Sequence, residues 1–385
     1  MSTSKGPLAG IRIVELAGLG PAPFGAMLLA DMGAEVVRID RTQGGPGIGL
    51  EAQFDILARG RKCVRADLKS PSGKDVVLRL IDQADAVIEG FRPGVLERLG
   101  LGPDVLLARN PRLVIGRMTG WGQDGPLAQR SGHDINYIAL AGALFSIGGK
   151  DGPPVPPLNL VGDFGGGGLL LAFGMLCALL EARVSGKGQV VDAAMVEGAA
   201  LLMTGVYAML AQGIFQEGRG NTILNGGAPF YGVYECADGE FVTIGALEPQ
   251  FYNEFVARLE LAPEDFAKRN DPRNWPMQRQ KLEAVFKTRT RDQWCEALQD
   301  TEICFAPVLR MTEAPHHPHN VARGVFAEVD GLMQPAPAPR FSRTATSLNP
   351  IAAPGTHTDD VLSRWGFTED EIAALHDEGA IAGSA

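Results

Sequence analysis

The sequence predicts an α/β protein, with a large domain on a parallel sheet and a smaller α+β domain. In the first part of the chain, apolar strand-like runs alternate with helical segments, which is typical of βαβ units and their right-handed crossovers. The chain has 385 residues, more than one ordinary domain contains. Beyond about residue 225 the alternation gives way to a β-hairpin pattern followed by helices.

The first βαβ unit begins close to the N-terminus. Residues 11–16 are an apolar run that predicts a buried strand, and residues 35–40 predict the next one. Between them we expect a glycine- and proline-rich turn at 18–25 and a helix over 26–32. This unit establishes the parallel start of the sheet.

The turn after the first strand invites comparison with dinucleotide-binding proteins. Asp40 even stands where a ribose-binding acid would. However, the glycines do not follow the G-x-G-x-x-G spacing, and two prolines occupy the loop where amides would face a pyrophosphate. We therefore interpret the segment as a turn that packs against its own helix.

The remaining large-domain elements follow from apolar runs and their lengths. We expect strands at 86–89, 113–118 and 190–192, and helices at the positions 75–84, 169–182 and 196–212. The last two helices carry almost no charge, which is typical of core or subunit-interface helices.

The smaller domain is marked by a hairpin. Strands at 230–236 and 241–244 flank the turn Asp238-Gly239, and helices are expected at 249–259 and 279–300. A proline-rich linker at 334–339 leads out, and residues 356–382 are expected to return to the first domain as a helix. The predicted domains are 1–224 completed by 331–385, and 225–330.

Composition limits the class of protein. The net charge of −10 argues against a nucleic-acid binder. The five cysteines are scattered without a C-x-x-C pair, so we expect neither a zinc site nor a disulfide framework, but a reducing cytoplasm. The N-terminus lacks the apolar region of a signal peptide, and the longest apolar segment, 169–180, is too short to span a bilayer.

A basic segment interrupts this acidic chain. Its cations are Arg41, Arg59, Arg61, Lys62, Arg65, Lys69, Arg92 and Arg98. So many cations within sixty residues suggest a site for phosphates, although a solvated basic surface is the alternative interpretation.

The stretch 131–168 carries the candidate chemistry. It contains His133 and Asp163, side chains that move protons near neutral pH, and a glycine run directly after the aspartate. Either residue by itself is also compatible with a structural role, as a core histidine or a turn aspartate. We expect Asp134, beside the histidine, to be structural and to bond nearby backbone.

Several motifs, taken together, carry a resemblance to a known family. They are LADMGAEVVRIDR (29–41), ADLKS (66–70), MTGWGQDGP (118–126), GHDINY (132–137), PPLNLVGDFGGG (156–167), GKGQVVDAAMVEG (186–198), GALEPQF (245–251) and PGTHTDDVLSRWGF (354–367). Through them nearly the whole chain resembles the family III CoA-transferases, and within them the α-methylacyl-CoA racemases. The resemblance implies a Rossmann-like large domain, a small domain and an obligate homodimer of interlocked rings.

The resemblance also implies a reaction. It is the interconversion of (R)- and (S)-2-methylacyl-CoA thioesters by removal and return of the α-proton, with no metal or organic cofactor. Inversion requires one acid/base group on each face of the carbon, and by resemblance these are His133 and Asp163. Glu248 matches the acidic partner of the histidine, and Asn159 and Tyr231 match supporting polar positions near the aspartate.

Further residues match positions that bind the CoA moiety. They are Arg41, Ala66, Leu68, Lys69, Arg92 and Arg98. Their cations would hold phosphates, and the backbone of 66–68 would meet the adenine. For the enolate oxygen we expect amide donors from the glycines 165–168, taken to open the helix at 169.

Three rival functions stay open. A CoA-transferase would use Asp163 as a nucleophile that forms a mixed anhydride and would need no opposing imidazole. A non-catalytic acyl-CoA-binding protein would keep the cations but tolerate loss of His133 and Asp163. A nicotinamide-dependent oxidoreductase is the third.

The His316-His317-Pro-His319 cluster lacks acidic ligands in register, so we expect no metal there.

Overall fold

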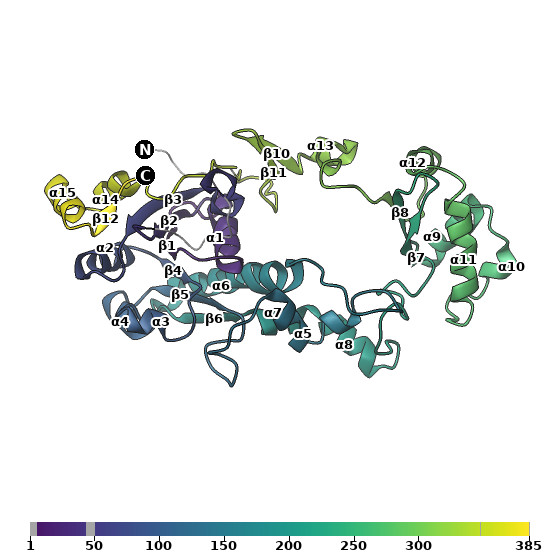
Figure 1. Cartoon of the computed structure of the whole chain (residues 1–385), viewed down its shortest axis with the longest axis horizontal. Helices are drawn as coiled ribbons and strands as arrows, with labels where there is room; N and C mark the ends of the chain where they lie inside the picture. Colours follow the sequence, from purple (N-terminus) through teal and green to yellow (C-terminus); the bar gives the residue numbers. More distant parts are fainter. Residues whose placement is uncertain (1–5, 44–50, 347, 385) are drawn as a thin grey trace. The chain divides into compact units, whose positions relative to one another are not determined.

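The computed structural model describes residues 6–43, 51–346 and 348–384, which form two compact units (Figure 1). Unit 1 comprises Met1–Ala141, Leu158–Leu202 and Gly324–Ala385, and unit 2 comprises Gly142–Pro157 and Met203–Arg323. Unit 2 thus takes in residues 142–157 and 203–224, which the sequence suggested would belong with the large domain.

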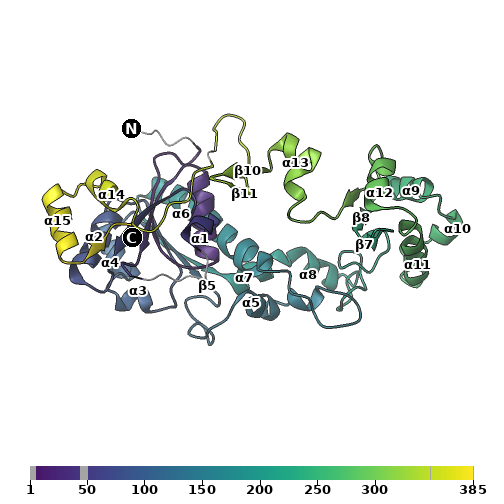
Figure 2. The same cartoon turned by 45° about the horizontal axis from the view of Figure 1, so that its top comes forward.

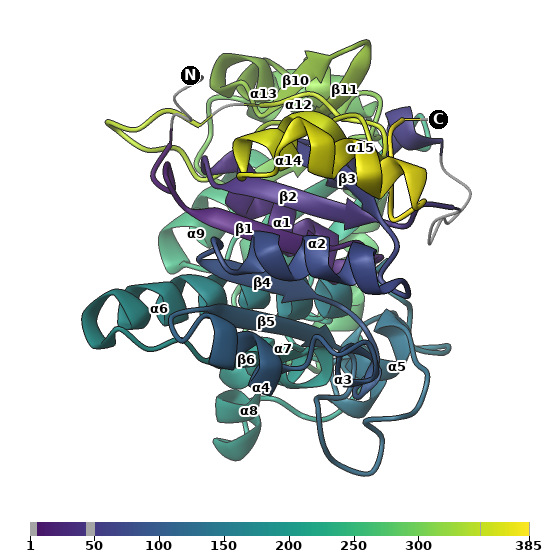
Figure 3. The ribbon, with the colours of Figure 1, turned by 90° about the vertical axis from the view of Figure 1, so that its left-hand side faces the viewer.

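Unit 1 is built on a seven-stranded sheet with the order β12-β3-β2-β1-β4-β5-β6 (Figure 3). Its strands are β1 Arg12–Leu16, β2 Glu35–Asp40, β3 Arg61–Ala66, β4 Ala86–Glu89, β5 Val114–Thr119, β6 Val190–Ala194 and β12 Ile381–Ala382. All pair in parallel except β12, which runs antiparallel to β3. The order in which the chain adds strands to the sheet reverses between β1 and β4, and doubly wound sheets bind ligands at this position. The predicted α/β class is confirmed.

Helices cover both faces of this sheet. They are α1 Pro21–Asp31, α2 Pro71–Ile81, α3 Val95–Arg98, α4 Pro103–Arg109, α5 Asp134–Leu140, α6 Leu169–Ser185, α7 Met195–Leu202, α14 Thr358–Arg364 and α15 Glu369–Asp377. Short 3₁₀ turns lie at Ala52–Phe54 and Ile56–Ala58. Because strand side chains alternate, Val14 packs into the core on the α2 side, whereas Ile13 packs into the core with α1 and α6.

Helix α1 begins earlier than the sequence suggested. The expected turn at 18–25 is in fact the first part of the helix, which starts at Pro21 directly after Gly20. Proline fits the first helical turn because the amide it lacks would have no partner there. Gly20 has φ +67° and ψ −117°, a conformation open only to glycine, and it makes the sharp entry.

The helix expected to begin at residue 169 begins at Leu160. A π-helical segment, η4 Leu160–Gly168, leads directly into α6, so that the continuous helix has 26 residues. By length and composition it could cross a membrane, contrary to the sequence expectation. In unit 1, however, its residues Leu171 and Met175 are fully buried in the core against the sheet, which identifies it as a core helix.

Two arginines of the basic segment are structural. Arg61 is buried and donates to Glu15, with 2.9 Å between Nε and Oε2, and Arg59 makes a buried ion pair with Asp31. Arg59 also donates to the carbonyl of Pro335, which ties the C-terminal segment to unit 1. The expectation that the whole segment binds phosphates is therefore wrong for these two side chains, because each already has a buried carboxylate partner.

The C-terminal segment is not one helix over 356–382 as expected. It forms α14, α15 and the edge strand β12, which completes the sheet next to β3. Thr368 starts α15 as an N-cap, with Glu371 closing the reciprocal capping pair. A short hairpin of β10 Phe326–Val329 and β11 Leu332–Pro335 precedes this segment.

Unit 2 is a small α+β fold (Figure 2). Its antiparallel strands are β7 Tyr231–Glu235, β8 Phe241–Gly245 and β9 Phe305–Pro307. Its helical segments are α8 Thr204–Ala211, α9 Pro249–Arg258, α10 Pro263–Phe266, α11 Trp275–Phe286, α12 Arg291–Leu298 and α13 Pro318–Arg323, with 3₁₀ turns at Leu144–Ser146 and Ala314–His316.

The hairpin expected around Asp238-Gly239 is present, with Gly239 at φ +79°. Two predicted helices are each divided in two. The helix expected over 279–300 stops before Thr290, whose side chain caps the new helix α12. The one expected over 196–212 is interrupted at Met203, between α7 and α8.

Candidate active site

The predicted CoA-binding cations gather at one edge of the unit 1 sheet. Arg41 follows β2, Lys69 follows β3, and Arg92 and Arg98 follow β4. Parallel strands end at the same edge, so all four belong to the ligand-binding side of the fold. Their side chains are exposed, and none makes an ion pair with the described residues.

The remaining two positions of this group act through the main chain. Ala66 is the last residue of β3 and is buried, while Leu68 packs partly against the core. Between them, the Asp67 amide donates to the carbonyl of Ala380, 2.9 Å away. The C-terminal strand thus occupies part of the backbone that we expected to meet an adenine.

Asp163 lies in the first turns of η4, half-buried beside α1. The amide nitrogen Nδ2 of Asn159 donates to its Oδ2 at 3.1 Å, which brings together two of the predicted site residues. A Cβ placed on Gly20 would lie 3.3 Å from the same oxygen. The glycine after β1 therefore leaves the space into which the Asp163 carboxyl projects.

Asp134 holds the start of this helix. Its Oδ2 accepts hydrogen bonds from the amides of Gly162 and Asp163, each at 2.7 Å. Asp134 is 7% exposed, and a Cβ on Gly162 would lie 2.5 Å from its carboxylate. The expectation that Asp134 bonds nearby backbone is confirmed, and its partner is the main chain of Asp163 itself.

The surroundings of Asp163 favour the protonated carboxyl. Burial raises its pKa above the ordinary 3.8, the Asn159 hydrogen bond lowers it, the negative Asp134 raises it and His133 lowers it, with a net upward shift. A carboxyl with a raised pKa holds and releases a proton closer to neutral pH than an exposed one.

His133 is the residue before α5, and its side chain is exposed. Its main-chain N–H donates to Oδ1 of Asn136 at 3.0 Å, which fixes the helix start. The next residue, Asp134, points inward to bond the Asp163 amide. The start of α5 therefore carries the His133 imidazole and, through Asp134, also holds the main chain of Asp163. His133 interacts electrostatically with Asp163 and lowers the pKa of that carboxyl.

The structure adds Tyr137 to this region, a residue that the sequence pattern did not single out. It lies 4.7 Å from the ring of Trp121 in an edge-on contact, and its hydroxyl donates to the carbonyl of Gly132. The pKa of Tyr137 is raised to about 12, mainly by burial and also by the charges of Asp163 and Asp134, while Arg92 lowers it. Tyr137 thus interacts electrostatically with both the candidate catalytic carboxyl and one of the predicted CoA-binding cations, Arg92. Its place in the GHDINY motif was the available signal.

The glycine run after Asp163 has a different role from the one expected. Residues 165–168 do not open a helix but continue η4 into α6, so their amides lie inside a helix rather than at its terminus. A Cβ on Gly166 would lie 2.6 Å from the Ala199 nitrogen, and one on Gly168 would lie 2.4 Å from the Pro21 carbonyl. These glycines allow close helix packing, and the expectation that they open a helix is wrong, so the terminus from which we expected amide donors for an enolate does not lie at these residues.

Two of the predicted catalytic residues belong to the other unit. Glu248 is the exposed residue before α9, and Tyr231 begins β7, both in unit 2. His133, Asp163 and Asn159 all belong to unit 1.

Within the described ranges, no three His, Cys, Asp or Glu side chains come together as metal ligands, and the histidines 316, 317 and 319 form no such group.

A doubly wound sheet with cations along its ligand edge and a partly buried carboxyl beside the first helix is typical of an enzyme that binds an anionic ligand and moves a proton. Residues 8–359 match the family model described as CoA-transferase family III, and the chain belongs to this family. Solved relatives agree, since a CAIB/BAIF family protein from Brucella suis superposes with TM-score 0.79 at 26% identity, covering 94% of this chain and 100% of that one.

Curated relatives are more similar in sequence. The chain is 44% identical to the alpha-methylacyl-CoA racemase of Mus musculus, over 96% of each chain. It is 42% identical to the alpha-methylacyl-CoA racemase of Homo sapiens, over 97% of each. The predicted family is thereby confirmed.

Proposed function

We propose that this protein is a racemase that interconverts (R)- and (S)-2-methylacyl-CoA thioesters. The observation that carries the proposal is the Asp163 carboxyl, with its raised pKa, in a chain more than 40% identical to proteins named for that reaction. A thioester acidifies its α-carbon only weakly, so the enzyme must supply a base on one face and an acid on the other.

Asp163 and His133 are the two proton-transfer groups of the proposal. Asp163 takes the α-proton of one epimer as a carboxylate, while the imidazole returns a proton to the opposite face, and the roles exchange for the reverse reaction. Asn159 orients the carboxyl through its 3.1 Å hydrogen bond. We expect no metal or organic cofactor, because the thioester carbonyl itself takes the charge left by the departing proton.

The exposed cations at the sheet edge would bind the CoA moiety. Arg41, Lys69, Arg92 and Arg98 lack carboxylate partners among the described residues, so their charge is available to phosphates. Ala66 and Leu68 would contribute main-chain contacts to the adenine, and of these two Ala66 also lies opposite Ile381 of β12.

We propose that the protein works as a homodimer of interlocked rings, with Glu248 and Tyr231 of one subunit completing the site of the other. One face of α6 is apolar and exposed in the single chain, through Leu169, Phe173, Leu180 and Val184. Val184 is 91% exposed, which is unusual for such a side chain and favours burial against another copy.

The unpaired state of the five cysteines supports a cytoplasmic location.

A complementation experiment tests this shared site. His133→Ala and Glu248→Ala are each expected to be inactive as homodimers. If the site is shared, a co-expressed heterodimer has one intact site, and a statistical mixture regains about a quarter of the wild-type activity. Absence of recovery in a verified heterodimer would place both residues in the site of a single subunit.

The reaction itself is tested by proton NMR with (S)-2-methyldecanoyl-CoA in D₂O. We expect the α-proton signal to disappear while both epimers form. Transfer of CoA to an added carboxylate without exchange would identify Asp163 as a nucleophile and the protein as a transferase. Binding with neither reaction would leave a thioester-binding protein and refute the racemase.

A further inference from the structure

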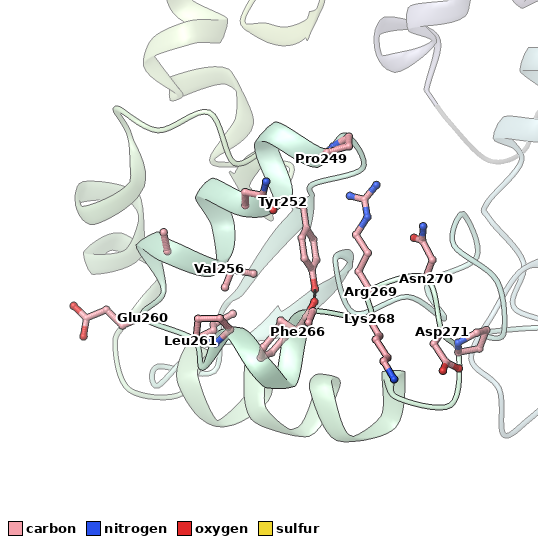
Figure 4. A pocket seen from close by; sticks show the side chains of 15 residues that line it. Pro249, Tyr252, Val256, Glu260, Leu261, Phe266, Lys268, Arg269, Asn270 and Asp271 are labelled. Atoms are coloured by element: carbon pink, nitrogen blue, oxygen red, sulfur yellow. Dashed lines mark hydrogen bonds between the residues drawn. The ribbon is translucent and has the colours of Figure 1, made fainter.

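Unit 2 contains a cavity of about 1060 Å³ that the proposed reaction does not use (Figure 4). It lies between one face of α9, α10 and residues 267–272. Neither Glu248 nor Tyr231 lines it. Its volume is of the size that proteins use for ligands the size of a drug or lipid chain.

Arg269 provides a cation without an anion in this cavity. Its guanidinium lies 5.2 Å from the ring centre of Tyr252 and 5.7 Å from that of Phe230. Its Nη1 is buried and has no hydrogen-bond partner among the described residues. The indole of Trp275 donates to the Arg269 carbonyl at 2.7 Å, which fixes the main chain below the side chain. A held, partly buried guanidinium with an unused donor is the usual recognition element for a carboxylate.

The acidic residues of the cavity wall do not supply that partner. Asp271 pairs with Arg273 at 2.7 Å, and Figure 4 shows the Glu260 carboxylate on the opposite side of the cavity from Arg269. Lys268 adds a second positive charge to the wall. The cavity wall therefore carries two cations, Lys268 and Arg269, and two carboxylates, and the Asp271 carboxylate is already paired with Arg273, which lies outside the lining.

The rest of the wall is apolar. Leu261 and Phe266 are buried parts of the unit 2 core, and Val256 packs beside them. The Tyr252 hydroxyl donates to the Phe266 carbonyl at 2.8 Å, so it offers no free donor to a ligand. Apolar surface next to one unpaired cation matches a molecule with an apolar chain and one anionic end.

We propose that this cavity binds an amphipathic carboxylate, its carboxylate on Arg269 and its apolar chain along Val256, Leu261 and Phe266. The inference does not depend on the proposed racemase reaction. Binding involves no covalent step, and the driving forces are burial of the apolar chain and a charge-assisted hydrogen bond in a partly dry site.

The test is isothermal titration of the full chain with decanoate, in the presence of saturating CoA. We expect saturable binding of one decanoate per chain and at least about tenfold weaker binding of decanol, which has the same chain without the charge. Arg269→Met keeps the bulk of the side chain and should weaken decanoate binding by about tenfold or more. Ala257→Trp, on the exposed rim of α9, should weaken binding by narrowing the cavity.

A matched variant controls for the substitution itself. Arg258→Met makes the same arginine-to-methionine change at a position on α9 that does not line the cavity. Arg258 is exposed and pairs with Glu254, so decanoate binding should be unchanged. Circular dichroism verifies that each variant is folded. No saturable binding, equal binding of decanol, or binding that survives both cavity substitutions would overturn the proposal.

Discussion

Removal of the Asp134 carboxylate tests how the candidate catalytic carboxyl is held. Asp134→Ala deletes the acceptor of the Gly162 and Asp163 amides, whereas Asp134→Asn keeps an oxygen acceptor and removes the charge. We expect the alanine variant to lose both stability and catalysis, and the asparagine variant to retain most of its stability.

The magnitude follows from the two 2.7 Å hydrogen bonds that Oδ2 accepts. A hydrogen bond to a charged group contributes about 1.5–3 kcal/mol, and an amide left buried without a partner costs a similar amount. Gly162 is buried and the Asp163 amide only partly so, which gives a loss of about 3 kcal/mol for Asp134→Ala. For a unit of this size that is roughly 6–12 °C in Tm. Asp134→Asn should cost about 1 kcal/mol.

Catalytic turnover should depend on the position of the Asp163 carboxyl as well as on the stability of the fold. If the start of η4 shifts by an ångström in the alanine variant, turnover should fall by about a hundredfold, with little change in KM for the CoA thioester. In Asp134→Asn, the loss of a negative neighbour lowers the pKa of Asp163, since that charge is one of its raising causes. The acid limb of the kcat profile should therefore move to lower pH.

Thermal unfolding and the pH dependence of α-proton exchange measure these effects. An alanine variant with unchanged Tm would show that water replaces the carboxylate without cost. An acid limb that stays in place in Asp134→Asn, in an otherwise stable protein, would show that Asp163 is not the group that titrates. Either result would refute the reasoning.

Three further predictions follow from other contacts. Asp163→Asn should lower exchange by about 10²–10⁴-fold. Folding raises the pKa of Asp163, so the wild type loses stability as the pH rises through that raised pKa. The asparagine variant does not ionise and should therefore have the higher Tm at pH 7. The difference in Tm between the two proteins should vanish below the ordinary pKa of 3.8. Gly20→Ala should lose about 1–3 kcal/mol of stability, measured by urea unfolding, because alanine is strained at a φ of +67°, and an unchanged free energy of unfolding would contradict this reasoning. Arg61→Met should lose about 3–5 kcal/mol in the same assay because Glu15 is left buried without its ion-pair partner, and Glu15→Gln in that background should restore part of the loss.

Local sequence features specified much of the fold. The apolar strand of β1, the helical spacing that follows and the Asp238-Gly239 turn each produce their structure through short-range preferences. The motif GHDINY likewise indicated both His133 and the backbone-bonding role of Asp134. Such features depend on neighbours in the chain, so they can be found before the fold is known.

Other features depended on partners distant in sequence. Nothing near Arg61 in the sequence distinguishes it from Lys69, yet one is buried against Glu15 and the other is exposed. The glycines after Asp163 suggested a flexible, amide-rich terminus, but they are helical, and Ala199 and Pro21 approach them so closely that a larger residue would not fit. Charge and flexibility along the sequence do not reveal which surface another segment will cover.

The sequence by itself determined the family, the α/β class and the identity of the candidate proton-transfer pair, since each follows from short motifs and patterns of neighbouring residues. Only the tertiary structure decided that Asp134 anchors the Asp163 main chain, that Tyr137 packs against Trp121, and that Arg269 holds an unpaired charge in a cavity. The physical reason is that burial, and with it the strength of a hydrogen bond or a charge, is a property of the packed fold.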